Sequence, residues 1–485
     1  MKLPVLTLRM LGHSRDLPSL PCGLCLDDVA EGADIPQHFV LQRALRWLPG
    51  RRLVAEGTVA GQSVLVKCFF GRRSQTALWR ELRGLRALLA AGLPAPGERL
   101  AYHMPQGGVL VTDWLASART LDLSRVEEQV AAVELLADLH AAGLSHADPH
   151  PGNFLLPAGT AQAVPIDVGA IAPRGCWSRG GRERGEWREL ARLIVQCPMD
   201  ALVSDTDRLA APSEAVERLV TTYCRRRGDA VRAPAASDWQ GFMDAARRSR
   251  VRRYLRKTLR STTEFEQRDR PDARVFVLRS ALSPALEAVI ADPAAAMATG
   301  EPLKAGRSAT VVRPKGAPGW VIKRYNRRNL LQSWRRRLAP RARAAWRNGH
   351  HLALLGIPTA RPLALIEASK GAGAGTPYLV LEDHGDCAID RHARTAGVSE
   401  RLATRVSRLL LGLRRADIAH RDTKASNLLV TAEEQVVLID LDGMRSRRGG
   451  DSADATRFLA NWTRAGDQPV HARFEAALRR VGLVS

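Results

Sequence analysis

The sequence is long and strongly basic. Its 485 residues exceed what one ordinary hydrophobic core accommodates, so two or three domains are expected. The 73 Lys and Arg residues against 50 Asp and Glu give a net charge of +23, which predicts a polyanionic partner. No apolar run approaches the roughly 18 residues that a transmembrane helix needs, so none is expected.

The cysteines and the N-terminal residues indicate a cytoplasmic protein. The seven cysteines are scattered, which fits reduced thiols better than a disulfide framework. Cys22 and Cys25 form a Cys-x-x-Cys, but no second pair or His cluster lies nearby in the sequence, so a zinc site is not expected. Arg9, Arg15 and Asp16 interrupt the first apolar stretch, which does not fit an export signal.

The first predicted elements place a lysine beside a glutamate. Residues 1–37 contain prolines and glycines without clear periodicity, so an irregular leader is expected there. Residues 52–70 predict two strands, and Lys67 lies inside the second, where an unpaired ammonium group is costly unless it faces a cleft. Residues 75–91 predict a helix with one leucine-rich face. Glu81 lies beside that face and either pairs with Lys67 or stays at the solvated surface.

A polar loop follows. Residues 108–115 predict a buried strand, and residues 126–142 predict a helix that leads into a loop at residues 144–153. The loop and the apolar segment after it carry four polar candidates, namely His146, Asp148, Asn153 and Asp167.

The rest of the first half is predicted to be helical. Residues 186–195 and 213–227 have helical patterns. Residues 247–260 hold eight basic residues, no acidic residue and an apolar stripe. This helix could pack on the first domain, bridge two domains or lie on anionic lipid. Residues 267–272 are polar and contain proline, which places a domain boundary near residue 265.

A second loop, at residues 420–427, reads His-Arg-Asp-Thr-Lys-Ala-Ser-Asn. In a phosphoryl-transfer loop a carboxylate accepts a hydroxyl proton, an amide five residues on holds magnesium, and a nearby lysine neutralises the moving phosphate. These would be Asp422, Asn427 and Lys424. Asp440 interrupts an apolar run at residues 436–441, as expected of a strand that delivers a metal-binding carboxylate, although an Asp that caps a turn gives the same pattern.

The two halves repeat the same residues in the same order. His420, Asp422 and Asn427 each lie 274 residues after their counterparts His146, Asp148 and Asn153. Asp440 lies 273 residues after Asp167, and Lys323 stands in a strand pattern like that of Lys67. Two long copies indicate a duplicated domain and not a solenoid. The predicted organisation is an irregular leader at residues 1–37 and two domains at residues 38–265 and 266–485.

The halves also differ. Neither contains a complete Gly-x-Gly-x-x-Gly turn. Between Lys323 and Ile357 there is no acidic residue, so the second half lacks an equivalent of Glu81. Either Lys323 pairs with another carboxylate, or the second domain works without the pair, or it is inactive. The ten basic residues between Lys323 and Arg347 again favour a polyanionic ligand.

Together these features resemble the bacterial lipopolysaccharide core kinases of the Kdo and heptose kinase (WaaP/InaA-like) family. The resemblance covers residues 52–260 and residues 304–485, and it includes the segments at residues 356–363 and 438–442. It implies an α+β fold with two tandem protein-kinase-like domains, each with a small β-rich N-lobe, a helical C-lobe and an ATP cleft between them. The first loop also resembles those of aminoglycoside and choline phosphotransferases and of the UbiB-like group.

The resemblance implies a role for each candidate residue. The phosphates of ATP would be held by Lys67, with Glu81 as its partner, and by Lys323. The acceptor hydroxyl would be oriented or deprotonated by Asp148 and Asp422, whose loops His146 and His420 would support. The Mg²⁺ ligands would be Asn153 and Asp167 in the first half and Asn427 and Asp440 in the second.

The resemblance also implies a substrate and a location. The acceptor would be a heptose or Kdo hydroxyl of the lipopolysaccharide inner core, at the cytoplasmic face of the inner membrane. The partners would be the core glycolipid, an anionic membrane surface and other lipopolysaccharide assembly enzymes, and nucleic acid is not expected. Two alternatives stay open: one domain is a pseudokinase scaffold, or the enzyme phosphorylates a small molecule or a protein.

Overall fold

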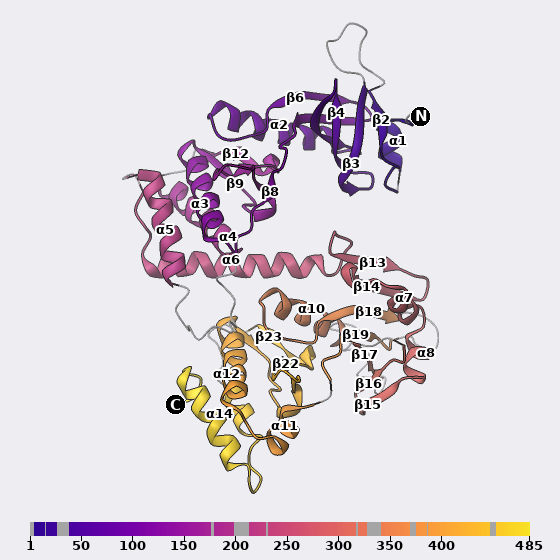
Figure 1. The fold of residues 1–485 in the computed structure, drawn as a ribbon, viewed down its shortest axis with the longest axis vertical. Helices are drawn as coiled ribbons and strands as arrows, with labels where there is room; N and C mark the ends of the chain where they lie inside the picture. The colour runs from indigo at the N-terminus through magenta and orange to yellow at the C-terminus, as the bar shows by residue number, and fades with distance from the viewer. Residues whose placement is uncertain are drawn as a thin grey trace. The chain divides into compact units, whose positions relative to one another are not determined.

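The computed structural model describes most of the chain. The described residues are 4–14, 16–26, 38–175, 179–197, 213–228, 231–316, 319–326, 341–368, 375–385, 387–446 and 453–485. They form two compact units, one up to Arg247 and one from Arg248 onward (Figure 1). Most of the predicted basic stretch from Lys323 to Arg347 lies outside the described residues.

The division between the units falls inside helix α6 (Ala236–Lys257), earlier in the chain than the predicted boundary near residue 265. The apolar stripe of this basic helix explains the difference. Tyr254 and Leu259 pack against the core of the second unit, and the Tyr254 ring contacts the Phe265 ring edge-on. The second half of α6 therefore belongs to the second unit.

The first unit begins with a seven-stranded sheet in the order β1-β2-β3-β4-β5-β7-β6. Its strands are β1 (Val5–Thr7), β2 (Cys22–Cys25), β3 (His38–Leu48), β4 (Arg52–Val59), β5 (Gln62–Phe69), β6 (Glu98–Met104) and β7 (Gly107–Asp113). The short helix α1 (Leu8–His13) follows β1. Residues 5–14 and 16–25 thus form regular elements where an irregular leader was expected from the sequence, because Leu8, Leu11 and Leu24 are buried in the core under this sheet.

Helix α2 (Ser74–Ala90) packs its leucine face against the body of the first unit. Leu78, Leu82, Leu85 and Leu88 are buried as predicted, whereas Leu89 is exposed. Gly84 in α2 lies against the distant turn that contains Val168. A Cβ atom at Gly84 would stand 1.9 Å from the carbonyl oxygen of Val168. This approach holds α2 against the segment that carries Asp167.

The remainder of the first unit is mostly helical, as Figure 1 shows. Its helices are α3 (Val126–Ala141), α4 (Arg179–Ile194), α5 (Ser213–Arg227) and the first part of α6. Short strands pair between them: β8 (Arg119–Thr120), β10 (Phe154–Leu156) and β11 (Val164–Pro165) in one sheet, and β9 (Leu144–His146) with β12 (Ile171–Pro173) in another. The 3₁₀ turn η1 (Pro151–Asn153) ends the predicted loop and contains Asn153, and the 3₁₀ turn η2 (Val168–Ala170) follows Asp167.

The second unit also begins with a seven-stranded sheet, in the order β13-β14-β18-β19-β17-β16-β15. Its strands are β13 (Phe265–Asp269), β14 (Ala273–Leu278), β15 (Glu301–Ala305), β16 (Ala309–Arg313), β17 (Trp320–Tyr325), β18 (Pro362–Ala368) and β19 (Tyr378–Glu382). A 3₁₀ turn, η5 (Arg279–Ala281), and three helices accompany it, α7 (Pro284–Ala291), α8 (Pro293–Ala298) and α10 (Arg341–Leu354).

The helical part of the second unit is organised around α12 (Glu400–Arg415), whose apolar face is buried. The Ser399 hydroxyl accepts a hydrogen bond from the backbone N–H of Leu402 (2.9 Å), which fixes where the helix starts. The other helices are α11 (Ile389–Thr395), α13 (Ala453–Leu459) and α14 (Gln468–Arg480). Between α12 and α13 lie β20 (Ile418–Ala419), η6 (Ala425–Asn427), β21 (Leu428–Val430), β22 (Val436–Leu438), η7 (Leu441–Gly443) and β23 (Arg445–Ser446).

The predicted α+β class is confirmed. Among the described residues, no helix combines the length and the apolar character that crossing a bilayer would take.

Candidate active site

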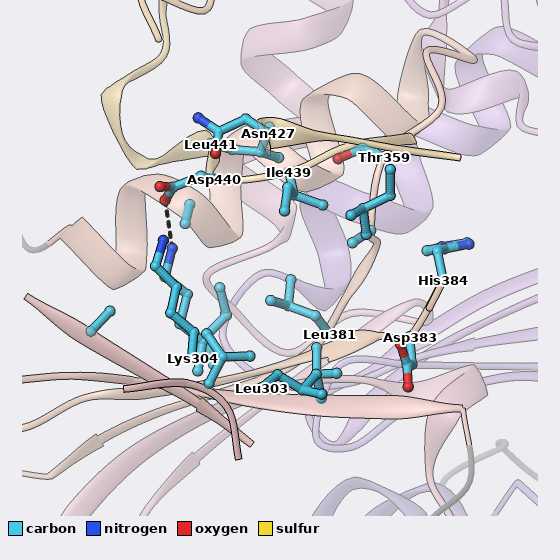
Figure 2. Close-up of a pocket in the computed structure, with 18 of the residues that line it drawn as sticks. Leu303, Lys304, Thr359, Leu381, Asp383, His384, Asn427, Ile439, Asp440 and Leu441 are labelled. Atoms are coloured by element: carbon cyan, nitrogen blue, oxygen red, sulfur yellow. Dashed lines mark hydrogen bonds and ion pairs between the residues drawn. The ribbon is translucent and has the colours of Figure 1, made fainter. Parts of the chain in front are cut away.

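A pocket of about 390 Å³ lies in the second unit, between its sheet and its helical part. The strand residues Leu303, Val311 and Leu381 form one apolar wall, and Leu429 and Ile439 form the other. In Figure 2, Asn427 and Asp440 come from the helical part and Lys304 points toward Asp440 from the sheet, whereas Asp383 and His384 lie on the opposite side of the pocket. A slot with two apolar walls, and with lysines and a carboxylate at one end, suits a flat base joined to phosphates.

Lys323 projects from β17 into this charged end and pairs with Asp440, with 2.6 Å between Nζ and Oδ1. Burial works against the charge of Lys323, but Tyr325, Asp440 and Asp442 outweigh it, so the pKa of the ammonium group is raised. Burial also opposes the charge of Asp440, yet Lys323 outweighs that effect and the pKa of the carboxyl group is lowered. Both groups are therefore charged at neutral pH, and Asp440 is the carboxylate that the sequence left unidentified.

The backbone of Asp440 is in the left-handed region, with φ 61°. Outside glycine this conformation is uncommon and costs on the order of 1 kcal/mol. It lies at the turn where β22 ends, so the carboxylate leaves the buried strand and enters the pocket. A local strain of this kind at a charged pocket is typical of a functional position.

Three of the catalytic-loop candidates, Asp422, Lys424 and Asn427, contact one another. The Asn427 side-chain amide donates to the backbone carbonyl of Asp422 at 2.8 Å and to its Oδ2 atom at 3.2 Å. Lys424 forms an ion pair with the other oxygen of Asp422 at 2.9 Å, and both side chains are largely solvent-accessible. The carboxylate of Asp422 is thus oriented from two sides and can still be reached by a substrate.

The loop is anchored by Asp454, which sequence reasoning missed. This buried carboxylate accepts hydrogen bonds from the backbone N–H groups of His420 (2.6 Å) and Arg421 (2.9 Å). The hydroxyl of Thr423 donates to the backbone carbonyl of Asp454 at 2.7 Å. His420 is buried as well, and its Nε2 atom lies 3.1 Å from the carbonyl oxygen of Ile439, which ties the loop to the Asp440 segment. Asp454 lies in the first turn of α13, the next helix after the loop. A known spacing between the His-x-Asp pattern and that helix is the one sequence signal that could have indicated it.

The first unit holds its lysine differently. Lys67 donates to Glu81 Oε2 at 2.8 Å and to the backbone carbonyl of Ile166 at 2.9 Å. Arg52 contacts the other Glu81 oxygen at 3.1 Å. Glu81 is only 1% exposed, so the surface alternative for this residue does not hold. Asp167 is the residue after Ile166, and the lysine therefore lies next to the segment that carries it.

The first loop has the same internal hydrogen bond as the second. The Asn153 amide donates to the backbone carbonyl of Asp148 at 3.0 Å. Glu189 takes the part that Asp454 plays in the second unit, since its Oε2 atom accepts from the backbone N–H of His146 at 2.8 Å. Burial lowers the pKa of His146 to about 4, so this ring is neutral at physiological pH. Its Nδ1 atom accepts from the N–H of Asp148 at 3.2 Å.

Residues 304–465 match the model of the lipopolysaccharide kinase (Kdo/WaaP) family. The second unit therefore contains a Kdo/WaaP-family domain, and this match supports the expectation that the chain is an ATP-dependent kinase. The matched segment begins at Lys304 and includes the pocket lysines, both ends of the catalytic loop, Asp440 and Asp454. No family match covers the first unit, so the predicted tandem duplication rests on the internal resemblance of the two halves.

Solved structures give weaker likenesses. One is "WaaP in complex with acyl carrier protein", with a TM-score of 0.29, 22% identity, and 44% of this chain and 90% of that chain covered. Another is choline kinase LicA from Streptococcus pneumoniae, with a TM-score of 0.30, 15% identity, and 42% and 81% covered. At such scores these likenesses decide nothing further. None of the curated proteins compared with the chain matches it.

Proposed function

We propose that this protein phosphorylates a sugar hydroxyl, on heptose or Kdo, of the lipopolysaccharide inner core. The observation that carries the proposal is the combination of the Kdo/WaaP family match with the charged pocket of the same segment. There, Lys323 and Asp440 face a cavity of about 390 Å³, and Asp422 stands on the loop that borders it. This is the set of groups that phosphoryl transfer from ATP to an alcohol needs.

The residues divide the reaction between them. Lys323 leaves its contact with Asp440 and binds the negatively charged phosphate oxygens of ATP instead. The acceptor hydroxyl is placed against Asp422, whose carboxylate accepts the hydroxyl proton. The hydroxyl oxygen forms a bond to the γ-phosphorus while the bond from that phosphorus to the bridging oxygen breaks, and ADP leaves with the bonding electron pair. Lys424 supplies positive charge next to the transferring group.

The residues at the charged end fit Mg²⁺. Because the Asn427 amide nitrogen donates to Asp422, its carbonyl oxygen is left for a cation, and Asp440 contributes a carboxylate. Oxygen atoms of this kind, completed by phosphate oxygens and water, are what Mg²⁺ prefers. Bound there, the ion would neutralise charge that builds up on the phosphates. The described residues contain no cluster of three or more His, Cys, Asp or Glu that would hold a metal without the nucleotide.

We also propose that the first unit is a second kinase-like domain, related to the second by duplication. Support comes from the matched residues of the two loops and from the buried Lys67–Glu81 ion pair, in which Lys67 Nζ lies 2.8 Å from Glu81 Oε2. The predicted domains at residues 38–265 and 266–485 agree with the two compact units except at residues 248–265, which belong to the second unit. If its nucleotide site is functional, Asp148 takes the role of Asp422, with Asn153 and Asp167 as magnesium ligands. A pseudokinase scaffold is the alternative for this unit.

The proposed location is the cytoplasmic face of the inner membrane, where the protein would associate peripherally and meet other lipopolysaccharide assembly enzymes. The basic helix α6 supports it. Its exposed side chains in the second unit are Arg248, Arg252, Arg253, Arg256 and Lys257, with Arg260 in the turn that follows. Each basic residue near an anionic membrane surface contributes about 1 kcal/mol to binding.

Phosphate transfer from labelled ATP to dephosphorylated core lipopolysaccharide tests the proposal. We expect transfer by the wild type and its loss in Asp422→Asn, while Asp148→Asn shows whether the first unit contributes. Both substitutions keep the side-chain size, and nucleotide binding with magnesium serves as the folding control. If the wild type binds ATP but phosphorylates a soluble sugar or a protein and no core acceptor, the lipopolysaccharide assignment is wrong.

A further inference from the structure

Two arginines beside the second catalytic loop are exposed. Arg421 directly precedes Asp422, and Arg445 lies in β23, where it pairs with Ala419 of β20. Within the described residues neither guanidinium group forms an ion pair, and Arg445 donates to the backbone carbonyl of Met444 at 3.1 Å. Neither arginine lines the nucleotide pocket. Both arginines are therefore exposed outside the nucleotide pocket.

The backbone at Arg421 is strained to hold this position. Its φ is 72°, in the left-handed region that residues with a side chain rarely adopt. Asp454 fixes it, because Oδ1 of that residue accepts from the Arg421 N–H at 2.9 Å. The same oxygen contacts Arg457 at 3.0 Å, so the charge of Asp454 is already balanced. Within the part of the chain that the structure describes, Arg421 and Arg445 consequently leave a local excess of two positive charges.

The first unit provides an internal comparison. There the same pairing of short strands places Ala172 opposite Ser145, where the second unit has Arg445 opposite Ala419. Ala147 precedes Asp148, where the second unit has Arg421. The loop thus forms without either arginine, and Ala147 does not have a positive φ. Building the loop does not require these two charges, so they point to a ligand.

We propose that Arg421 and Arg445 form an anion subsite that binds a phosphate or carboxylate group of the acceptor, next to the hydroxyl that Asp422 deprotonates. Arginine suits this task because its planar fork of N–H groups matches both anions and remains charged at any physiological pH. The inference rests on the proposed function and adds the residues that select the acceptor. It also predicts that the first unit does not bind the same anionic group.

The test compares two acceptors and two variants. The acceptors are core oligosaccharide with its carboxylates and phosphates, and the same oligosaccharide after carboxyl reduction and dephosphorylation. The variant is Arg421→Gln with Arg445→Gln. The control is Arg401→Gln, which removes an exposed arginine near the start of α12, about 20 Å of helix away from the loop.

For the charged acceptor we expect the double variant to raise KM about tenfold or more, with kcat within about twofold of the wild type. For the neutral acceptor, KM should be the same in both proteins. The control should match the wild type throughout. Equal KM values for the charged acceptor in wild type and double variant would overturn the subsite, as would an equal loss on both acceptors, since that indicates damage to the loop.

Failure of the proposed function is separable from failure of the subsite. If no core acceptor is phosphorylated, binding of inorganic phosphate is measured by ³¹P NMR on the full chain, with the nucleotide pocket filled by a non-hydrolysable ATP analogue. An affinity at least tenfold lower in the double variant than in the wild type and the control supports the subsite. Equal affinities overturn it.

Discussion

Replacing Asp454 by Asn probes how much the anchor of the catalytic loop contributes. The carboxylate accepts from two loop N–H groups, those of His420 at 2.6 Å and Arg421 at 2.9 Å, through different oxygens. An amide keeps one accepting oxygen and presents an N–H₂ group to the other donor. Hydrogen bonds to a charged acceptor contribute about 1.5–3 kcal/mol, so losing one and weakening the other costs about 3 kcal/mol. Since 1.4 kcal/mol is a factor of ten, the ordered loop becomes about 100-fold less populated.

We therefore expect kcat/KM of the Asp454→Asn variant to fall by up to about 100-fold in the transfer assay. Nucleotide affinity should change little, because Asp454 does not line the pocket. Asp467→Asn is the matched control, since Asp467 is equally buried at 4% exposure and pairs with Arg394 away from the loop. An Asp454→Asn enzyme within about threefold of the wild type, or a control that loses as much activity, would refute the anchoring role.

Two further predictions concern stability. Burial lowers the pKa of His350 to about 3. Below the unfolded value of about 6.5 the unfolded chain binds more protons than the folded one, so stability falls as pH drops from 6.5 toward 3, by about 2 kcal/mol at pH 5. His350→Leu should remove that part of the pH dependence of the free energy of unfolding measured in urea. An unchanged dependence of that free energy on pH would contradict the prediction. Gly84→Ala should destabilise the first unit by at least about 2 kcal/mol, because the new Cβ atom meets the Val168 carbonyl, whereas Gly241→Ala, in open space on α6, should be neutral or stabilising. Thermal unfolding measures both, and equal effects would contradict the close helix approach.

The sequence predicted the residues whose chemistry conflicts with their surroundings. Lys67 stands in an apolar strand and Asp440 in an apolar run. A charged side chain in such a segment is costly unless it faces a cleft or pairs with a group of opposite charge. The helix face of α2 followed from leucine spacing, and the buried Glu81 was one of two alternatives. A local sequence pattern was enough to predict these features because each pattern spans only a short stretch of the chain.

What the sequence did not show depends on contacts between distant segments. Asp454 lies 32 residues after Asp422, and Asp440 lies 117 residues after Lys323, so no periodic pattern links either pair. The β1-α1-β2 segment was missed for the same reason. Its short, glycine-containing pieces have little propensity of their own and are ordered by pairing with β3.

The pocket lysine has different partners in the two units, and this difference affects how each unit would bind ATP. Lys67 has Glu81 and a backbone carbonyl, so its position is set before any nucleotide arrives. Lys323 relies on Asp440, the carboxylate that magnesium would also need. If the proposed site is correct, Lys323 would hold the phosphates and Asp440 would hold the cation, so nucleotide and metal would be expected to bind to the second unit together. Either ligand alone would leave one buried charge without its partner, a cost of several kcal/mol.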